Sequence, residues 1–234
     1  MLRNSFIVLL VAAFGLLLYS VILKPYSTPV TLNRTAAYYN THEAEQIGAA
    51  NVVTAVVVTY RGLDTLGEVT VLFLTALVIG FFLKRNLSRE TSEEKTPGSE
   101  LLATASRVLV PGSIILGTYV FLNGHLTPGG GFQGGAVIGT AVLLLLLAHP
   151  RNTLSDKIFH RIESLSGFVY VILGLAGMLF AGGFLDTRIL PAGEMLTLIS
   201  AGAIPVIYSL IGLKVGAEIS GIILNINETK NNTE

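Results

Sequence analysis

Long, uninterrupted apolar runs constrain this chain more than any other feature. The first run, Phe6–Leu23, would form a helix of roughly 27 Å, close to the hydrocarbon core of a bilayer at about 30 Å. Further runs lie at 63–83, 101–122, 135–148, 162–184 and 195–213, the last continuing as helix to 226. In lipid a chain must satisfy its own backbone polar groups, which a helix does. The sequence therefore predicts an all-α integral membrane protein of about six transmembrane helices.

Composition supports this class and excludes several kinds of chemistry. Hydrophobic residues make up 51% of the chain, charged residues only 13%, and the mean hydropathy is +0.67. The formal net charge is zero, so no global field favours nucleic acid as a partner. Cysteine is absent and there are four scattered histidines. We therefore expect no metal site and no cofactor in this chain, and we expect any electron-carrying group to lie in a partner.

Two apolar segments leave the number of spans open. The first run follows Arg3 and also fits a signal peptide, but no small-residue cleavage pattern follows and the run is long, so we expect a retained span. The second segment, Ile47–Tyr60, is short for a span. We expect a partial or interfacial helix there, which leads into the next span through a break at 61–64. If it crossed the membrane, the topology downstream would invert.

Positive charge predicts the orientation. Two connecting segments on the side of Arg3 carry most of it, namely Lys84, Arg85, Arg89 and Lys95 in one and Arg151, Lys157 and Arg161 in the other. The opposite segments hold only Lys24, Arg34 and Arg188. By the positive-inside rule the richer side is cytoplasmic. We expect a multi-pass protein of the cell membrane with both termini in the cytoplasm.

A polar segment divides the chain. Residues 85–100 are charged, contain Pro97-Gly98 and lack apolar periodicity, which indicates a cytoplasmic linker. The linker would join a two-span unit at 1–84 to a four-span unit at 101–226, followed by a polar tail at 227–234.

A glycine-rich segment, GHLTPGGGFQGG, occupies 124–135 between two spans. It is no phosphate-binding loop, because no Gly-Lys-Ser/Thr and no βαβ pattern accompany it. A mobile outer loop is one interpretation. The following run, 135–148, would span only about 21 Å, so we favour a loop partly buried in the membrane and covered by protein. The structural residues of this loop would be His125, Pro128, Gly129, Gly130, Gly131, Phe132 and Gln133, with Phe132 as an anchor and His125 and Gln133 bonding to freed backbone groups.

The stretch from Tyr60 to Leu83 carries two acids, Asp64 and Glu68, on one helical face. Asp64 suits the positive start of a helix, where it would act as a cap. Glu68 lies a turn or more inside the apolar run, where acids are costly and usually line an ion path or pair with a base. We favour the ion path for Glu68, with a structural ion pair as the alternative.

The last helix repeats this spacing with Lys214 and Glu218. The two side chains neutralise each other or lie at the interface in one interpretation, and belong to an ion relay in the other. Pro205 in the same run should kink the helix. His160 is expected to be solvated, and Glu163 to form an interfacial pair with Arg161.

Two motifs resemble a known system. GHLTPGGGFQGGAVIGTAVLLLL resembles the MnhB (MrpB) subunit family of Mrp-type Na+/H+ antiporters. NVVTAVVVTYRGLDTLGEVTVLF is similar to the C-terminal part of MrpA, which corresponds to the separate small protein MbhE of membrane-bound hydrogenases. The fusion of both units in one chain resembles the archaeal membrane-bound sulfane sulfur reductase.

The resemblance implies a non-catalytic membrane subunit in the ion-translocating module of a ferredoxin-linked respiratory complex. Its partners would be antiporter-like membrane subunits and redox subunits that hold iron–sulfur clusters and a nickel-iron or related site. The acid of the RG-DTLGE motif, here Glu68, is implied to lie on the Na+ or H+ path, and Asp64, Lys214 and Glu218 are further candidates for it. The alternatives are a purely structural linker subunit and a subunit of a plain Mrp antiporter. A self-contained transporter is disfavoured, because this sequence lacks the inverted repeats that such proteins contain.

Overall fold

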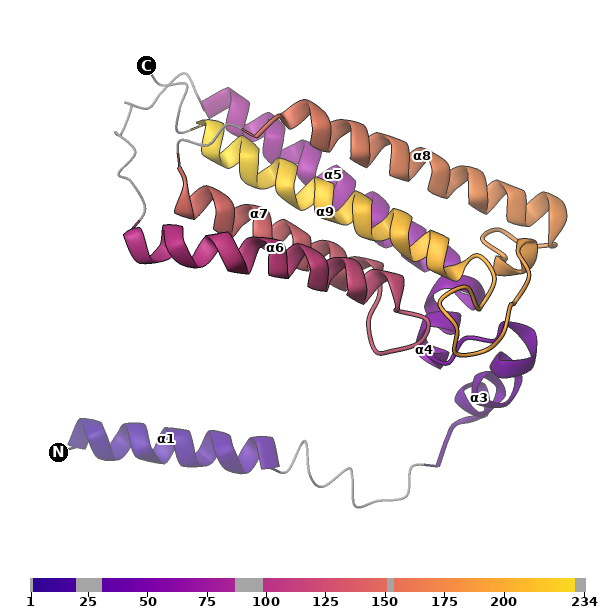
Figure 1. Ribbon diagram of the computed structural model, residues 1–234. Coiled ribbons are helices and arrows are strands. Elements are labelled where there is room, and N and C mark those ends of the chain that lie inside the picture. Colours follow the sequence, from indigo (N-terminus) through magenta and orange to yellow (C-terminus); the bar gives the residue numbers. More distant parts are fainter. Residues whose placement is uncertain (1, 20–30, 87–98, 151–153, 230–234) are drawn as a thin grey trace. The chain divides into compact units, whose positions relative to one another are not determined.

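The computed structural model describes residues 2–19, 31–86, 99–150 and 154–229 (Figure 1). The chain forms two compact units, Met1–Tyr38 and Tyr39–Glu234. The first unit contains α1 (Leu2–Leu18) and the start of α3 (Arg34–Gln46). Within α1 the apolar stretch is Ile7–Leu18, which is shorter than the expected first span. Residues 20–23 of that expected span lie outside the described residues.

Within the described residues, five helices are long and apolar enough to cross a membrane. They are α5 (Gly62–Asn86), α6 (Glu100–Leu122), α7 (Gly131–Ala148), α8 (Asp156–Phe180) and α9 (Ile204–Thr229). Together with the shorter apolar helix they confirm the predicted all-α membrane fold.

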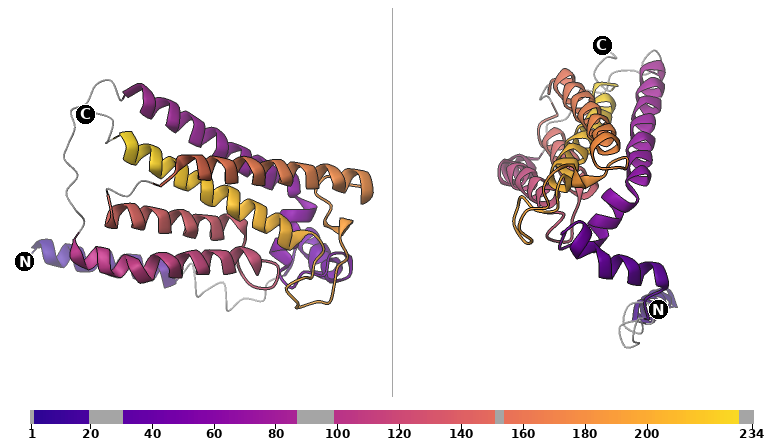
Figure 2. Two further views of the ribbon diagram at one scale, coloured as in Figure 1. Left: turned by 45° about the horizontal axis from the view of Figure 1, so that its top comes forward. Right: turned by 90° about the vertical axis from the view of Figure 1, so that its right-hand side faces the viewer.

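The five long helices alternate in direction (Figures 1 and 2). At one end of the bundle α5, α7 and α9 finish and α6 and α8 begin; we call this the linker end. At the other end lie the segment before α5, the loop between α6 and α7, and the chain between α8 and α9; we call this the glycine-loop end. The charged residues at the end of α5 and the start of α8 therefore share the linker end.

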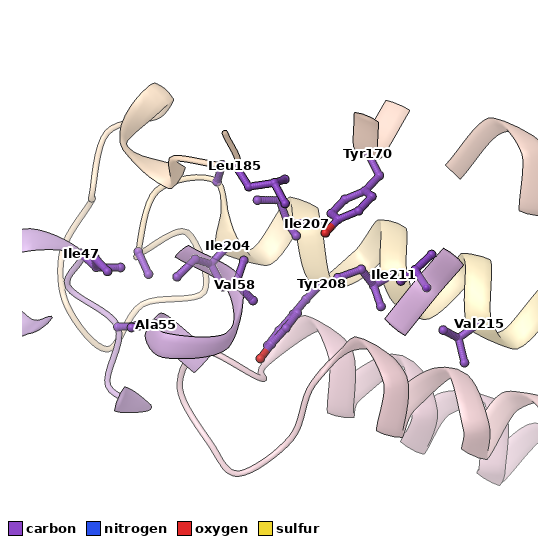
Figure 3. Packing of buried hydrophobic residues seen from close by; sticks show 14 residues of the cluster. Ile47, Ala55, Val58, Tyr170, Leu185, Ile204, Ile207, Tyr208, Ile211 and Val215 are labelled. Carbon is purple, nitrogen blue, oxygen red and sulfur yellow. The ribbon is translucent and has the colours of Figure 1, made fainter. Parts of the chain in front are cut away.

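Helix α9 lies at the centre of the bundle. It packs against each of the other four long helices. More than half of the residues in its most apolar stretch are buried, compared with 6% in α5. The main hydrophobic cluster follows one side of α9 through Ile204, Ile207, Ile211 and Val215, as Figure 3 shows. Any side chain on the inner face of α9 is consequently shielded by neighbouring helices.

The predicted partial helix near 47–60 is present. It consists of α4 (Val52–Ala55), which continues as a π-helical turn, η2 (Val56–Tyr60). The chain then breaks at Arg61, as expected, and α5 starts at Gly62. The hydroxyl of Thr65 donates to the carbonyl of Val57 at 2.8 Å and so gives one carbonyl of the π-helical turn a hydrogen-bond partner. Gly62 is favoured there because a β-carbon would lie 3.0 Å from Leu185.

Helix α7 begins four residues earlier than the apolar run indicates. Residues 131–135, which the sequence pattern assigns to the glycine-rich loop, form its first turn, so the helix spans about 27 Å and needs no added length from the loop. The reason is close packing: a β-carbon on Gly135 would lie 2.7 Å from Val215 of α9, and one on Gly134 would overlap the carbonyl oxygen of Gly117 in α6. These glycines let the backbones approach, which favours helix association in lipid.

Two other helix limits differ from expectation. Helix α8 begins at Asp156 and ends at Phe180, so its first turns are charged and precede the predicted start at 162. Helix α9 begins at Ile204, whereas residues 195–203 form turns and bends. Pro205 therefore lies in the first turn of α9, where no backbone donor is needed, and the expected kink is absent because the helix does not extend upstream.

The α7–α9 contact generates a stability prediction. Gly135→Leu should clash with Val215 and with the backbone of α9, and should lower the free energy of unfolding by about 1–3 kcal/mol or more. Thermal unfolding of the purified protein in mild detergent measures this. Gly112→Leu is the matched control, because Gly112 is exposed on α6 with open space around it. Equal melting temperatures for the two variants would contradict the role of Gly135.

Candidate functional site

The glycine-rich loop is held by the short helix before α5. The hydroxyl of Tyr208 in α9 donates to the hydroxyl oxygen of Thr54 in α4 at 3.1 Å, and Thr54 donates in turn to the carbonyl of Gly124 at 2.6 Å. Tyr208 also packs against Gly124 so closely that a β-carbon there would lie 2.6 Å from its ring. One buried hydrogen-bonded chain therefore joins α9, α4 and the loop.

Asn51 reinforces this connection. Its side-chain amide donates to the carbonyls of Gly124 and Thr127 at 2.9 and 3.1 Å, and its oxygen accepts from the backbone of Val53 and caps α4. The backbone amide of Asn51 donates to the carbonyl of His125 at 3.0 Å. The loop is thus covered by protein, and its cover comes from the N-terminal half of the same chain.

The individual loop residues take different positions. His125 is completely buried, and its Nε2 donates to the carbonyl of Thr197 at 3.3 Å. Burial lowers the pKa of His125, which favours the neutral imidazole. Phe132 packs against the main hydrophobic cluster, as an anchor should. Pro128 and Gln133 are exposed, so Gln133 does not take the inner position that its expected role requires.

A second group of polar residues lies inside the bundle, where α8 faces α9. The ammonium of Lys214 donates to Glu218 at 2.6 Å and lies 3.9 Å from Glu163 of α8. The Glu218 side chain is fully buried, and those of Lys214 and Glu163 are nearly so. The predicted pairing of Lys214 with Glu218 is present, but the pair lies inside the protein and not at an interface.

The expected partner of Glu163 is wrong. The sequence predicts a surface pair with Arg161, whereas the Glu163 carboxylate lies between His160, at 3.4 Å, and Lys214. Helical spacing explains the difference: Glu163 falls on the face of α8 that contacts α9, and Arg161 points to the exposed side. His160 is more than half exposed and also contacts Asp156 at 3.2 Å, so it is partnered as well as solvated.

A hollow of about 280 Å³ adjoins these charges between α5 and α8. Lys214 lines the hollow, and its ammonium is 4.9 Å from the centre of the Phe73 ring. The remaining lining is mostly apolar, with hydroxyl groups from Thr70, Ser164 and Tyr170. A hollow of this size with several polar groups is roomy enough for ordered water.

Glu68 lies elsewhere. It is exposed on α5, roughly 9 Å along the helix from Gly62, and within the described part of the chain it has no hydrogen-bond or ion-pair partner. Leu66 and Thr70 line the hollow, whereas Glu68, two residues from each, does not line it. The structure does not bring Glu68 together with Lys214.

Asp64 occupies the first turn of α5, near the positive end of the helix. Its carboxylate accepts from the guanidinium of Arg61 at 2.6 Å, and both side chains are more than half exposed. Asp64 therefore forms a surface pair at the glycine-loop end. The described residues contain no cluster of three or more potential ligands that could hold a metal ion.

Two further charged groups at the glycine-loop end are not singled out by the sequence motifs. Glu43 in α3 is buried and accepts from the backbone amide of Ala49 at 2.8 Å, and burial raises the pKa of its carboxyl. Asp186 accepts from Arg188 at 2.9 Å, which lowers the pKa of that carboxyl. Both stabilise turns of the backbone. Neither has a signal in the sequence, because the contacts depend on how the chain folds back.

Two families match the chain. The family described as a domain related to the MnhB subunit of Na+/H+ antiporters matches residues 101–221. The MbhE family, whose members are described as a subunit of MBH, matches residues 2–97. Both matches agree with the resemblances drawn from the two sequence motifs.

Similar proteins cover most of the chain. An uncharacterized protein of Methanocaldococcus jannaschii is 34% identical over 199 residues, which is 73% of this chain and 74% of that protein. A chain in the structure of the membrane-bound sulfane sulfur reductase, an archaeal respiratory membrane complex, is 40% identical, with a TM-score of 0.74 over 97% of this chain and 98% of that one. A chain of the Mrp complex from Dietzia is 25% identical, with a TM-score of 0.67, and this chain spans 26% of its length.

The loop contacts generate a second prediction. Thr54→Val keeps the shape of the side chain but leaves the buried Tyr208 hydroxyl without its acceptor, at a cost of about 1–3 kcal/mol. The melting temperature in detergent should fall by about 2–12 °C. Thr140→Val is the control, because that exposed hydroxyl bonds only to Ala136 of its own helix. A fall as large in the control would show that the link across the elements contributes nothing.

Proposed function

The chain belongs to the family of domains related to the MnhB subunit of Na+/H+ antiporters, and we propose that it is a non-catalytic membrane subunit that forms part of a path for Na+ or protons. The observation that carries this proposal is Glu68, an acid without a partner in the described chain, on the exposed side of a membrane-length helix. A charge that faces lipid costs about 2.5–3.5 kcal/mol at the centre of a membrane helix and less toward its ends, so Glu68, in the second turn, would still be unfavourable there. Glu68 therefore faces either a partner subunit or a hydrated gap beside one.

The exposed surface of α5 supports a partner at this position. Only 6% of the residues in its most apolar stretch are buried in the described chain, because among the long helices its main contact is with α9, on one side. A membrane helix from a neighbouring subunit would cover the rest and enclose Glu68 between the two proteins. Such an interface admits water next to a carboxylate more readily than a packed core does, and Gly67 leaves space beside it.

The mechanism we propose is reversible carboxylate chemistry. Glu68 alternately holds a proton or Na+, because a carboxylate oxygen is a suitable ligand for both and the site lacks a fixed counter-charge from the described part of this chain. Lys214 and Glu218 form a second ionisable element of the path, deeper in the bundle. Asp64, paired with Arg61 at the glycine-loop end, would lie at the mouth nearest Glu68.

The similar structures support one type of complex over the other. The 40% identical chain of the sulfane sulfur reductase is matched over almost its whole length, whereas this chain spans about a quarter of the Mrp chain from Dietzia. We therefore propose a respiratory complex of the sulfane sulfur reductase or hydrogenase type over a plain Mrp antiporter. Redox chemistry and its iron–sulfur or nickel-iron groups would belong to partner subunits, since this chain has no cysteine.

The orientation is also part of the proposal. The linker end carries the basic residues at the end of α5 and the start of α8, so we place it in the cytoplasm. The C-terminal end of α9 is then cytoplasmic, and the glycine-loop end faces the outside. We retain the division into a unit at 1–84, a linker at 85–100 and a unit at 101–226, although α5 and α9 pack together.

The test is Glu68→Gln in the intact complex. The substitution removes the charge and keeps the shape, so the complex should assemble while Na+-dependent proton transport falls at least tenfold. Transport is measured in proteoliposomes with a pH-sensitive dye and labelled sodium after an imposed ion gradient. Glu194→Gln, an exposed acid in the segment before α9, is the control and should leave transport unchanged.

Other outcomes reject the proposal. Unchanged transport in Glu68→Gln would remove Glu68 from the path. Loss of the complex, with normal transport by whatever complex remains, would support the purely structural linker instead. Subunit composition after affinity purification, read by mass spectrometry, separates these results and identifies the redox partners.

A further inference from the structure

A ladder of titratable side chains leads from the linker end into the bundle. It begins with Asp156 and His160 in the first turns of α8, continues to Glu163 on the next turn, and crosses to Lys214 and Glu218 of α9. Side-chain exposure falls along it, from 58% at His160 to 12% at Glu163 and 0% at Glu218. The ladder thus connects the surface with the protein interior.

Neighbouring groups are close enough for proton exchange along most of the ladder. The His160 ring lies 3.4 Å from Glu163, and Lys214 lies 2.6 Å from Glu218. The gap between Glu163 and Lys214 is 3.9 Å, which a small side-chain rotation or one water closes. The hollow that both residues line, about 280 Å³ in volume, provides room for either.

Charge is unbalanced at the buried end. Two carboxylates, Glu163 and Glu218, share one ammonium, Lys214, and none of the three side chains is more than 12% exposed. Oε2 of Glu218 is buried and has no hydrogen-bond partner within the described residues. From α5 the group against Lys214 is the Phe73 ring, which adds no charge. A surplus negative charge in such surroundings is costly, so the cluster is stabilised by one additional proton.

We propose that this ladder is a proton entry path, in which His160 and Glu163 deliver a proton from the linker end to Lys214 and Glu218. The inference rests on the proposed function, because it adds an entrance to the same ion path. His160 and Glu163 are the new residues: neither belongs to the motifs that carry the family resemblance, and the structure places Glu163 beside Lys214.

The proton transfers balance. The protonated His160 ring gives its Nδ1 proton to Oε2 of Glu163 and becomes neutral. Lys214 then passes one proton to Oε1 of Glu218 and takes up the proton from Glu163, so that Lys214 is an ammonium again. The sum is one proton moved from His160 to Glu218, with Glu163 restored as a carboxylate. Asp156, 3.2 Å from Nε2 of the ring, orients Nδ1 toward Glu163 between transfers.

The first test is Glu163→Gln in the intact complex. The amide keeps the size of the side chain but cannot accept the proton, so proton uptake in proteoliposomes should fall at least tenfold while the subunits still co-purify. Glu100→Gln is the matched control, an exposed acid at the start of α6 on the same end of the bundle. Unchanged uptake in Glu163→Gln would overturn the proposal.

The second test uses the exposure of His160. His160→Gln should assemble normally, because the side chain is mostly solvated, and proton uptake should fall at least tenfold. Free imidazole added to the buffer should restore uptake, because the small base replaces the missing ring. A merely structural role would not respond to imidazole, so a loss of uptake without rescue would overturn the entry path, as would no loss at all.

The experiments can reject either proposal without rejecting the other. If Glu68→Gln stops transport but Glu163→Gln and His160→Gln do not, the ion path remains and the entry path is rejected. If the α8 variants stop proton uptake and Glu68→Gln does not, the entry path stands and Glu68 is rejected as a path residue. If no variant changes transport, both are wrong.

Discussion

The close approach of α7 to α9 is the contact on which the rest of the structure depends. In lipid, apolar side chains gain little by meeting each other, so helices associate where their backbones come close. Gly131, Gly135 and Gly139 form one face of α7, and a β-carbon on any of them would lie within 2.8 Å of α9. This contact fixes α9 at the centre, and α5, α6 and α8 then pack around it.

The burial of α9 determines how strongly its polar residues interact. On an isolated helix Lys214 and Glu218 would be an ordinary pair four residues apart, worth a few tenths of a kcal/mol. Inside the bundle, removal of either partner leaves a buried charge at a cost of about 3–5 kcal/mol. A pair of this kind is a poor way to gain stability and a good way to hold an exchangeable proton, which is consistent with the ladder that reaches it from α8.

The glycine-rich loop connects the segment before α5 to the helix bundle. Its carbonyls at Gly124 and Thr127 are taken up by Asn51, and Thr54 connects it to α9. The segment before α5 and the loop before α7 thus depend on each other, although the two matched families divide the chain between them.

Much of the fold could be predicted because lipid leaves few choices. Runs of apolar residues must become helices, and the predicted positions agree to within a few residues for α5 and α6. The predicted starts of α7 and α8 are too late because glycines and charged residues resemble breaks, and the predicted start of α9 is too early because the apolar residues before Pro205 resemble the beginning of a span. Gly131 is helical because packing outweighs the weak intrinsic preference of glycine, and Asp156 because a helix extends beyond the apolar core at the linker end.

The candidate site divides in the same way. Residue type and spacing are enough to single out Glu68, Lys214 and Glu218, because an acid or base inside a membrane-length run is costly wherever the helices lie. The contacts of Asn51 and Thr54, and that of Glu163 with Lys214, depend on which helix face meets which neighbour, over a separation of 73 residues between Asn51 and Gly124. Local sequence carries no signal for such distances, so those partners were decided only when the helices packed.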